Sequence, residues 1–273
     1  MVATYATLSQ FDFPIAFAVA SATDMLSCDG QTDTVFEWKS VTKPLAALAT
    51  LVAVDQGQVA LDEEAGPPGS TVRHLLSHAS GLQFEAGAPA QSPERRRVYS
   101  NLGFEVLEEH VSSKVGMSFQ EWTNHAVLEP LEMDSVEFYG SAAYGARGNV
   151  WDVLALGIEM LTPTLISADL GLAARTAQFP GLDGVLPGFG KQSPNDWGLG
   201  YEIRGKKKPH WTAPEACPET FGHFGQSGSF VWVDPRCQLV GAFLGAESFR
   251  ASVHGTLWPA LNSEVLAAHG TRE

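Results

Sequence analysis

A serine and a lysine three positions apart, Ser40 and Lys43, have types and spacing that suit nucleophilic chemistry. A serine hydroxyl is a poor nucleophile until a base takes its proton, and a lysine can be that base if burial lowers its pKa. Apolar residues recur at i, i+4, i+7 and i+11 from Val41, which predicts a helix from Ser40 onward. Residues i and i+3 share a helical face, so the hydroxyl and the amine would point the same way. Alone, the tetrad is weak evidence, because chance places about one in a chain of this size.

Two further motifs follow in the chain. Tyr99-Ser100-Asn101 lies on a predicted loop just before a helix, where a phenol could shuttle protons and the adjacent amide could bind a substrate. His223-Phe224-Gly225, followed by Gln226, lies on a predicted strand. A strand edge that ends in glycine can offer a backbone N–H to an oxyanion while leaving room for a substrate.

In this order the three motifs resemble the serine β-lactamase family, specifically its class C branch with related esterases and D-alanyl peptidases. That family carries S-x-x-K, then Y-x-N, then K-T-G or H-x-G. The resemblance runs from about Pro14 to Gly245 and so covers most of the chain. Other stretches that resemble the family are 36–43, 71–82, 130–133, 197–201 and 221–225 followed by 233–235.

The resemblance implies that Ser40 is acylated, with Lys43 either as its base or as the group that holds a nearby tyrosine ionised. Tyr99 would be the second acid/base, and Asn101 would contact the amide or ester side chain of the substrate. The backbone N–H groups of Ser40 and Gln226 would form the oxyanion hole. No cofactor and no metal are implied. The expected substrate is a small-molecule ester, amide or β-lactam.

The third motif departs from the form found in β-lactam enzymes. There, a lysine and a hydroxyl residue bind the carboxylate of the drug, whereas His223 and Phe224 precede Gly225 here. A histidine is charged only part of the time near neutral pH, and a phenylalanine donates no hydrogen bond. The exchange favours esters or other neutral acyl substrates. An alternative is a catalytically impaired penicillin- or peptide-binding module that uses the same cleft.

Two other arrangements compete with these motifs. His74 and His78 stand at i and i+4 of a predicted helix, a spacing that can bind zinc. Leu75, however, stands where the H-E-x-x-H form requires glutamate. Ser193-Pro194-Asn195 is a second S-x-N element, but it lies in a Pro/Gly-rich stretch without a tyrosine. Both therefore rank below the three motifs described above.

The composition limits the partners of the chain. With 273 residues and 44% hydrophobic content the chain can bury a sizeable core, and its net charge of −14 predicts no nucleic-acid and no membrane partner. The basic clusters 95–97 and 206–208 are interpreted as solvated loop charge, but the first lies beside the Tyr99–Asn101 motif, so a role at the rim of a site stays open. The three cysteines are too few, and odd in number, for a disulfide framework. The oligomeric state is open.

The sequence also bears on localisation. No apolar run reaches the roughly 18 residues of a membrane span. The apolar run at 14–20 follows Asp12 and lacks the positive flank of a signal peptide, so it is better explained as a buried strand. We infer a cytoplasmic protein, or one whose leader lies outside this sequence.

The order of predicted elements indicates an α+β fold. Strands are expected at 14–21 and 34–38, with a turn at Cys28-Asp29-Gly30 between them. Helices are expected at 71–77, 102–114, 149–161, 168–178 and 251–269. A further helix is expected to begin at the capping box formed by Ser118 and Glu121. Strands at 197–204, 219–225, 228–234 and 238–245 complete the set, with Pro235-Arg236 as a hairpin connection.

This order predicts an antiparallel β-sheet flanked by N- and C-terminal helices, with an inserted, mostly helical lobe. We expect a single β-lactamase-like domain, 1–273, of two lobes. Residues 1–57 plus 195–273 would form the sheet lobe, and 58–194 the helical lobe. The Gly/Pro-rich stretch 179–194 would mark the boundary between them.

Overall fold

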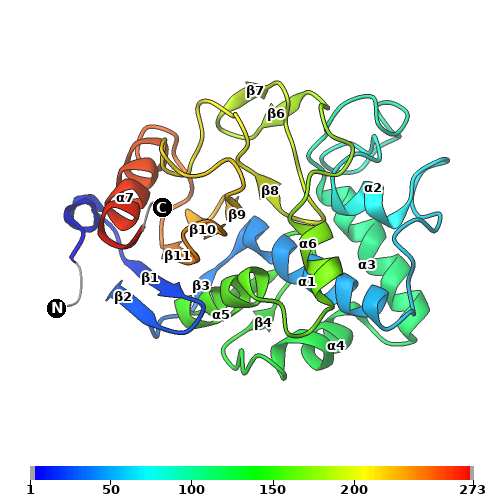
Figure 1. Cartoon of the computed structure of the whole chain (residues 1–273). Helices are drawn as coiled ribbons and strands as arrows, with labels where there is room; N and C mark the ends of the chain where they lie inside the picture. Colours follow the sequence, from blue (N-terminus) through cyan, green and yellow to red (C-terminus); the bar gives the residue numbers. More distant parts are fainter. Residues whose placement is uncertain (1–3, 271–273) are drawn as a thin grey trace.

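A six-stranded antiparallel sheet forms the centre of the computed structural model, which describes residues 4–270 (Figure 1). The strands lie in the order β2-β1-β11-β10-β9-β8. Their bounds are Met25–Gly30, Ile15–Ser21, Leu239–Gly245, Ser229–Asp234, Phe221–Gly225 and Glu202–Ile203, in that order. Because β1 pairs with β11, the first and the last strand of the chain meet inside the sheet.

The sheet separates two hydrophobic cores, and strand β1 contributes to both. Ala16 and Ala18 pack into the core that contains α1, Thr42–Asp55, and α5, Val150–Leu161. Phe17 and Val19 point to the opposite side, where they pack with Trp258 and other residues of the last helix, α7. That alternation is the period of two expected of a strand with both faces covered. Helix α7 spans His254–His269.

The remaining elements surround the sheet (Figure 1). The further helices are α2 (Val72–Leu76), α3 (Asn101–Val115), α4 (Phe119–Thr123) and α6 (Ala168–Ala174), with 3₁₀ turns η1 (Ala6–Gln10) and η2 (Lys39–Val41) and a π-helical turn η3 (Asn124–Leu128). Two small sheets comprise β3 (Phe36–Glu37), β5 (Ala146–Gly148) and β4 (Glu137–Phe138), and the hairpin of β6 (Gly184–Leu186) with β7 (Gly190–Gln192).

Helix α1 is central because it is buried on all sides. All residues from Thr42 to Ala53 are buried, rather than one face as the sequence periodicity predicts. Pro44 falls in the first turn, where no intrahelical hydrogen bond is lost. Ser40 precedes the helix in η2 instead of starting it. The nucleophile candidate therefore lies on a tight turn at the edge of the core.

Several predicted elements are confirmed and others are wrong. The Ser118–Glu121 capping box and the hairpin turn at Pro235 are as predicted. The turn predicted at Cys28-Asp29-Gly30 belongs instead to edge strand β2, whose exposed face tolerates polar residues while its backbone pairs with β1. Of the strand predicted at 197–204, only Glu202–Ile203 pairs with the main sheet. Residues 179–194, expected as a boundary, contain the β6–β7 hairpin.

The predicted fold class, an antiparallel sheet with flanking helices and helical insertions, is confirmed. The division into lobes stays a prediction. Helix α5, which lies within the stretch 58–194, packs on the sheet, with Gly157 against Val240 and Val231. An added Cβ at Gly157 would lie 2.4 Å from the Val240 side chain, so this glycine lets helix and sheet approach closely.

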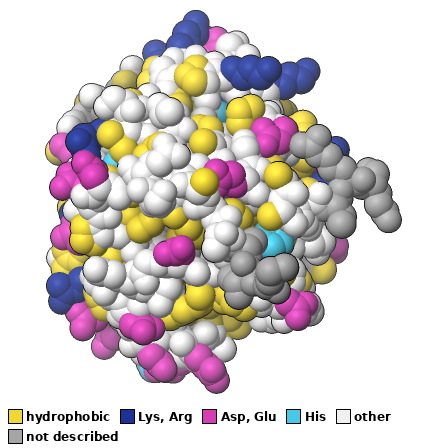
Figure 2. Space-filling model, turned by 90° about the vertical axis from the view of Figure 1, so that its left-hand side faces the viewer, with side chains coloured by type: hydrophobic (Ala, Val, Ile, Leu, Met, Phe, Trp, Pro, Cys, Tyr) yellow, Lys and Arg dark blue, Asp and Glu magenta, His cyan; other side chains and the backbone are white. Residues whose placement is uncertain are grey.

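The charged clusters differ from the prediction. Acidic side chains are scattered over the face that carries η1 and α7 (Figure 2), as the net charge leads one to expect. Arg97 and Lys207, however, are buried, because backbone carbonyls and one carboxylate satisfy their donors. The interpretation of these two residues as solvated loop charge is wrong. None of the helices within residues 4–270 is long and apolar enough to cross a membrane.

Candidate active site

The turn η2 presents Ser40 to Lys43 in the first turn of α1. The Lys43 Nζ lies 3.4 Å from the Ser40 Oγ. Lys39, directly before the serine, has a φ of 47°, a left-handed conformation that a non-glycine residue adopts only where its surroundings enforce it. The Val41 N–H donates to the Trp38 carbonyl at 3.1 Å and closes the turn. The predicted serine–lysine pair is thus in contact.

Lys43 is fully buried and has two close hydrogen-bond acceptors. Its Nζ donates to the Asn101 Oδ1 at 2.6 Å and to the Ala143 carbonyl at 2.8 Å. Burial lowers the pKa of the Lys43 amine well below its ordinary value, while the Glu105 carboxylate acts in the opposite direction. A neutral amine has two N–H groups and one lone pair. With both N–H groups directed at Asn101 and Ala143, the lone pair is left for Ser40.

The Ala143 carbonyl is held in place by the start of the loop that carries it. The Ala142 N–H donates to the Glu108 Oε2 at 2.8 Å, and the Ser141 hydroxyl donates to the Glu105 Oε1 at 3.3 Å. Both glutamates belong to α3, the helix that begins at Asn101. One helix therefore positions both acceptors of the Lys43 amine.

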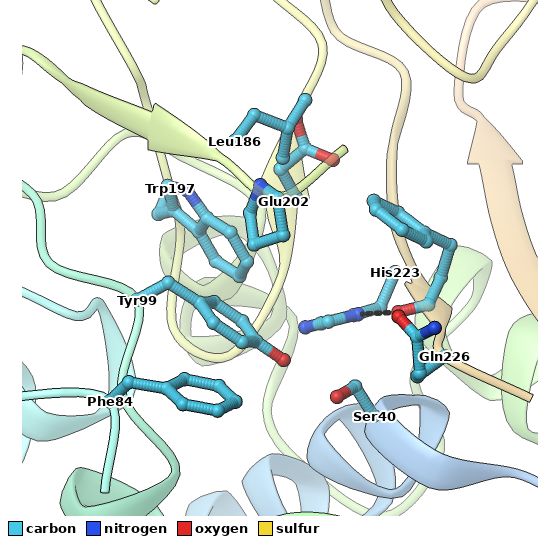
Figure 3. Close-up of a pocket in the computed structure, with 10 residues that line it drawn as sticks. Ser40, Phe84, Tyr99, Leu186, Trp197, Glu202, His223 and Gln226 are labelled. Carbon is cyan, nitrogen blue, oxygen red and sulfur yellow. Dashed lines mark hydrogen bonds between the residues drawn. The ribbon is translucent and has the colours of Figure 1, made fainter. Parts of the chain in front are cut away.

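Tyr99 lies just before α3, where Ser100 caps the helix by accepting from the Gly103 N–H at 2.9 Å. Its hydroxyl points toward Ser40 in the cavity (Figure 3). Burial raises the pKa of the Tyr99 phenol above its ordinary value, against the lowering effect of its hydrogen bond with Ser40. The phenol is therefore protonated at neutral pH, which disfavours a role for Lys43 in holding it ionised.

Strand β9 ends at Gly225, beside the turn η2 that carries Ser40. An added Cβ at Gly225 would lie 2.3 Å from the Trp38 carbonyl oxygen, so a larger residue does not fit. The Ser229 hydroxyl of β10 donates to the same carbonyl at 2.9 Å. These contacts bring the backbone of Gln226 next to the turn that carries Ser40, the arrangement predicted for an oxyanion hole.

His223 enters the same cavity from β9. Its Nδ1 lies 2.7 Å from the Phe224 carbonyl oxygen, which fixes the proton on Nδ1 and leaves Nε2 as an acceptor. Nε2 is buried and has no hydrogen-bond partner among the described residues. Burial is the main cause that lowers the pKa of His223 to about 3. His223 is therefore neutral at physiological pH.

A cavity of about 290 Å³ joins these groups (Figure 3). Of the predicted site residues, Ser40, Tyr99, His223, Phe224 and Gln226 line it. Lys43 and Asn101 lie behind this wall, with Asn101 only 8% exposed. Its predicted contact with the substrate stays a prediction. The three motifs do not include the other lining residues: Phe84, Leu186, Pro187, Trp197 and Glu202.

Glu202 brings a buried carboxylate to the cavity wall. Its Oε1 accepts from Lys207 and His210 at 2.9 Å each, and its Oε2 accepts from the Trp211 indole at 2.6 Å. Burial acts to raise the pKa of this carboxyl, but Lys207 and His210 outweigh it and hold the pKa well below its ordinary range. Lys207 belongs to the basic cluster at 206–208. The sequence signal for this ion pair was that Lys207 follows Glu202 by five residues.

The two competing arrangements have other partners. His74 completes a capping box with Thr71, and its Nε2 lies 3.0 Å from Glu94. The His78 Nδ1 accepts from the Ser100 N–H at 3.2 Å. Asn195 of the second S-x-N element accepts from the Arg97 side chain and from the Trp197 indole. Neither arrangement contributes a histidine, serine or asparagine to the lining of the Ser40 cavity.

The fold and the paired serine and lysine indicate a serine hydrolase of the β-lactamase and penicillin-binding type. A family model described as Beta-lactamase matches residues 18–262. The chain therefore belongs to the Beta-lactamase family, a family of serine hydrolases. This confirms the family predicted from the order of the three motifs.

Individual relatives show how far the similarity reaches. A crystal structure of a β-lactamase from Mycobacterium bovis superimposes with a TM-score of 0.95 at 46% identity, over 97% of this chain and 98% of that one. Penicillin-binding protein 4* of Bacillus subtilis is 25% identical over 162 residues, 45% of this chain and 36% of that protein. Esterase EstB of Burkholderia gladioli is 39% identical over 66 residues, 19% of this chain and 17% of that protein. The matches thus span about a third or less of these two curated relatives.

Proposed function

We propose that this protein hydrolyses esters or amides with neutral acyl groups through an acyl-enzyme on Ser40. The observation that carries the proposal is the environment of Lys43. A fully buried amine with a lowered pKa, whose two close acceptors occupy its N–H groups, lies 3.4 Å from the serine hydroxyl. That arrangement suits a general base better than a structural cation.

The proposed acylation begins when the Ser40 proton passes to Lys43 and the Oγ forms a bond to the carbonyl carbon of the substrate. The backbone N–H groups of Ser40 and Gln226 stabilise the negative charge on the carbonyl oxygen. When this tetrahedral intermediate collapses, the bond between the former carbonyl carbon and the leaving oxygen or nitrogen breaks. The proton held by Lys43 then reaches the leaving oxygen or nitrogen through the Tyr99 hydroxyl.

Deacylation uses the same groups in reverse. A water molecule gives a proton to Tyr99, which passes its own proton to Lys43, and the water oxygen forms a bond to the acyl carbon. The bond between that carbon and the Ser40 Oγ then breaks. The proton returns to Ser40 by way of Lys43, which leaves a free carboxylic acid. The protonated state of Tyr99 and the neutral state of Lys43 are the starting states that this relay requires.

The third motif supports a neutral acyl group. His223 presents an acceptor, Nε2, to the cavity and Phe224 presents a hydrocarbon ring. Neither group donates a hydrogen bond to a carboxylate at neutral pH. The environment of His223 therefore favours esters over β-lactams, whose carboxylate would need a donor at this position.

The test compares wild type with Ser40→Ala on nitrophenyl esters, nitrocefin and a D-Ala-D-Ala peptide. We expect wild type to hydrolyse the esters and the variant to lose that activity. Intact-mass spectrometry would show a covalent adduct on wild type alone. Full activity of Ser40→Ala on every substrate would refute the mechanism. Rapid acylation of Ser40 without turnover would favour the alternative, an impaired binding module that uses the same cleft.

A further inference from the structure

A second, larger hollow adjoins the Ser40 cavity. Its volume is about 640 Å³, and it shares the side chains of Phe84, Tyr99 and Pro187 with the inner cavity of about 290 Å³. We call it the outer hollow. Tyr99 therefore stands between the two spaces, with its hydroxyl toward Ser40 (Figure 3). A substrate whose scissile bond lies at Ser40 can extend past Tyr99 into the outer hollow.

The rim of the outer hollow exposes large apolar side chains. Phe84 is 49% exposed and Val185 is 48% exposed. They come from different segments, since Phe84 lies in the loop before α3 and Val185 lies in the β6–β7 hairpin. Exposed apolar side chains that gather around a concave surface mark a binding site more often than isolated ones do. The hollow therefore suits an apolar chain.

One free cation lines this apolar space. The Arg96 side chain is exposed, lines the outer hollow and has no hydrogen-bond or ion-pair partner within residues 4–270. Its backbone is fixed, because the Gln91 side chain donates to the Arg96 carbonyl at 3.2 Å. The next residue, Arg97, is buried and donates to the carbonyls of Ser77 and Asn195. In a chain with a net charge of −14, an unpaired guanidinium beside an apolar hollow has the geometry to bind a carboxylate through two N–H groups.

We propose that the outer hollow binds the alcohol part of the substrate, an apolar chain that ends in a carboxylate held by Arg96. This inference rests on the proposed function. The leaving oxygen takes its proton from Tyr99, the side chain that the two spaces share, so the chain attached to that oxygen is the part directed outward. The outer hollow is also the larger space, from which a cleaved alcohol can leave while the acyl group remains on Ser40.

The predicted substrate class is therefore the esters of ω-hydroxy carboxylic acids. Water adds across the ester, the bond between the acyl carbon and the alcohol oxygen breaks, and a carboxylic acid and an ω-hydroxy carboxylate are released. No oxidant, reductant or cofactor is needed. The carboxylate of the alcohol part lies at Arg96 throughout and does not react.

The test uses ω-acetoxy carboxylates of increasing chain length, together with the ω-acetoxy carboxamides of the same length, which lack the charge. At the best length we expect kcat/KM of wild type to be about tenfold higher for the carboxylate, the ratio that one charge-assisted hydrogen bond gives. Arg96→Gln should abolish this preference and Arg96→Lys should restore part of it. Arg95→Gln is the matched control, because Arg95 is exposed but lines neither space, and it should behave as wild type.

The apolar part of the inference has its own variant pair. Val185→Ser should lower kcat/KM for long alkyl acetates and leave methyl acetate unchanged. Val35→Ser is the control, since Val35 is 46% exposed but lines neither the inner cavity nor the outer hollow. The inference is overturned if wild type does not prefer the carboxylate, or if Arg96→Gln keeps the preference.

Failure of the inference can be separated from failure of the proposed function. Loss of ester hydrolysis in Ser40→Ala, with Arg96→Gln indistinguishable from wild type, would refute the outer site alone. Retained hydrolysis in Ser40→Ala would refute the proposed mechanism. Calorimetric binding to the Ser40→Ala protein tests the outer site without turnover. Tighter binding of the carboxylate than of the carboxamide, lost in Arg96→Gln, would support it, and equal binding would overturn it.

Discussion

The Lys43 amine donates a 2.6 Å hydrogen bond to the Oδ1 of Asn101, a residue 58 positions further along the chain. This contact joins the first turn of α1 to the first turn of α3 inside the core. It uses one N–H of the amine, as the Ala143 carbonyl uses another, so the remaining position of the nitrogen lies toward the Ser40 Oγ, 3.4 Å away. Burial lowers the pKa of the Lys43 amine, whereas Asn101 and Ala143 set its orientation.

Replacing Lys43 with an apolar side chain of similar length should remove the base. We expect Lys43→Met to lower kcat on nitrophenyl esters by about 10²–10⁴-fold, the usual contribution of a general base. Circular dichroism would check that the variant is folded. Lys114→Met, on the exposed surface of α3, is the control and should keep wild-type rates. Near-normal turnover by a folded Lys43→Met protein would contradict the role given to the amine.

His223 should make stability depend on pH. Its pKa is 6.5 in an ordinary environment and about 3 in the folded protein, so between these values the unfolded state binds a proton that the native state does not. The contribution of His223 is therefore present above pH 6.5 and is lost as the pH falls toward 3, by at most about 1.4 kcal/mol per pH unit.

Urea unfolding of wild type and His223→Leu across this pH range would measure the effect. Other buried histidines, such as His78 and His210, also titrate, so the difference in slope between the two proteins is the quantity of interest. The slope should be shallower for His223→Leu. Parallel curves for wild type and His223→Leu would count against a neutral, buried His223.

Gly225→Ala should separate strand β9 from the turn η2, which carries Ser40. The added Cβ would lie 2.3 Å from the Trp38 carbonyl oxygen, so the two backbones must move apart. We expect a loss of stability of about 1–3 kcal/mol and a fall in kcat of about a hundredfold, because a small displacement of the Gln226 N–H, which we propose as an oxyanion donor, would be costly. Gly255→Ala in α7 is the control, since its Cβ meets nothing closer than 4.0 Å. A fully active Gly225→Ala would argue against this N–H as an oxyanion donor.

Glu202→Gln should destabilise the protein more than any exposed charge deletion. It leaves Lys207 buried without its carboxylate, which costs about 3–5 kcal/mol. Glu137→Gln, which removes the partner of Arg147 on the surface, should cost about 1 kcal/mol or less. Chemical denaturation measures both values. Similar values for the two variants would mean that the buried pair is not ionised.

Short-range signals explain which parts of the site could be predicted. Ser40, Lys43, Tyr99 and His223 lie in compact motifs, and the strong apolar strands and helix caps fix their order in the fold. The S-x-x-K motif cannot indicate that the Asn101 side chain and the Ala143 carbonyl accept hydrogen bonds from the Lys43 amine, because both come from distant segments of the chain.

The missed residues depend on contacts that local patterns do not encode. Glu202 lies on a two-residue strand, and its importance comes from Lys207, whose neighbours suggested a solvated loop. Val185 and Leu186 lie in a short hairpin within a Pro/Gly-rich stretch, where turn residues outnumber strand formers. The walls of the cavity therefore required the structure, whereas the motif residues Ser40, Tyr99 and His223 that line it could be chosen from the sequence.

Different elements of the fold hold the rim of the cleft and the groups proposed to react. Ser40 and the Gln226 backbone are joined through the main sheet by the contacts of Gly225 and Ser229 with Trp38, whereas Phe84 and Val185 come from a loop and from a hairpin outside that sheet. Substitutions in the loop or in the hairpin would leave the contacts of Gly225 and Ser229 with Trp38 in place. The side chains at the rim can thus be exchanged one segment at a time without moving the groups that we propose to carry out hydrolysis.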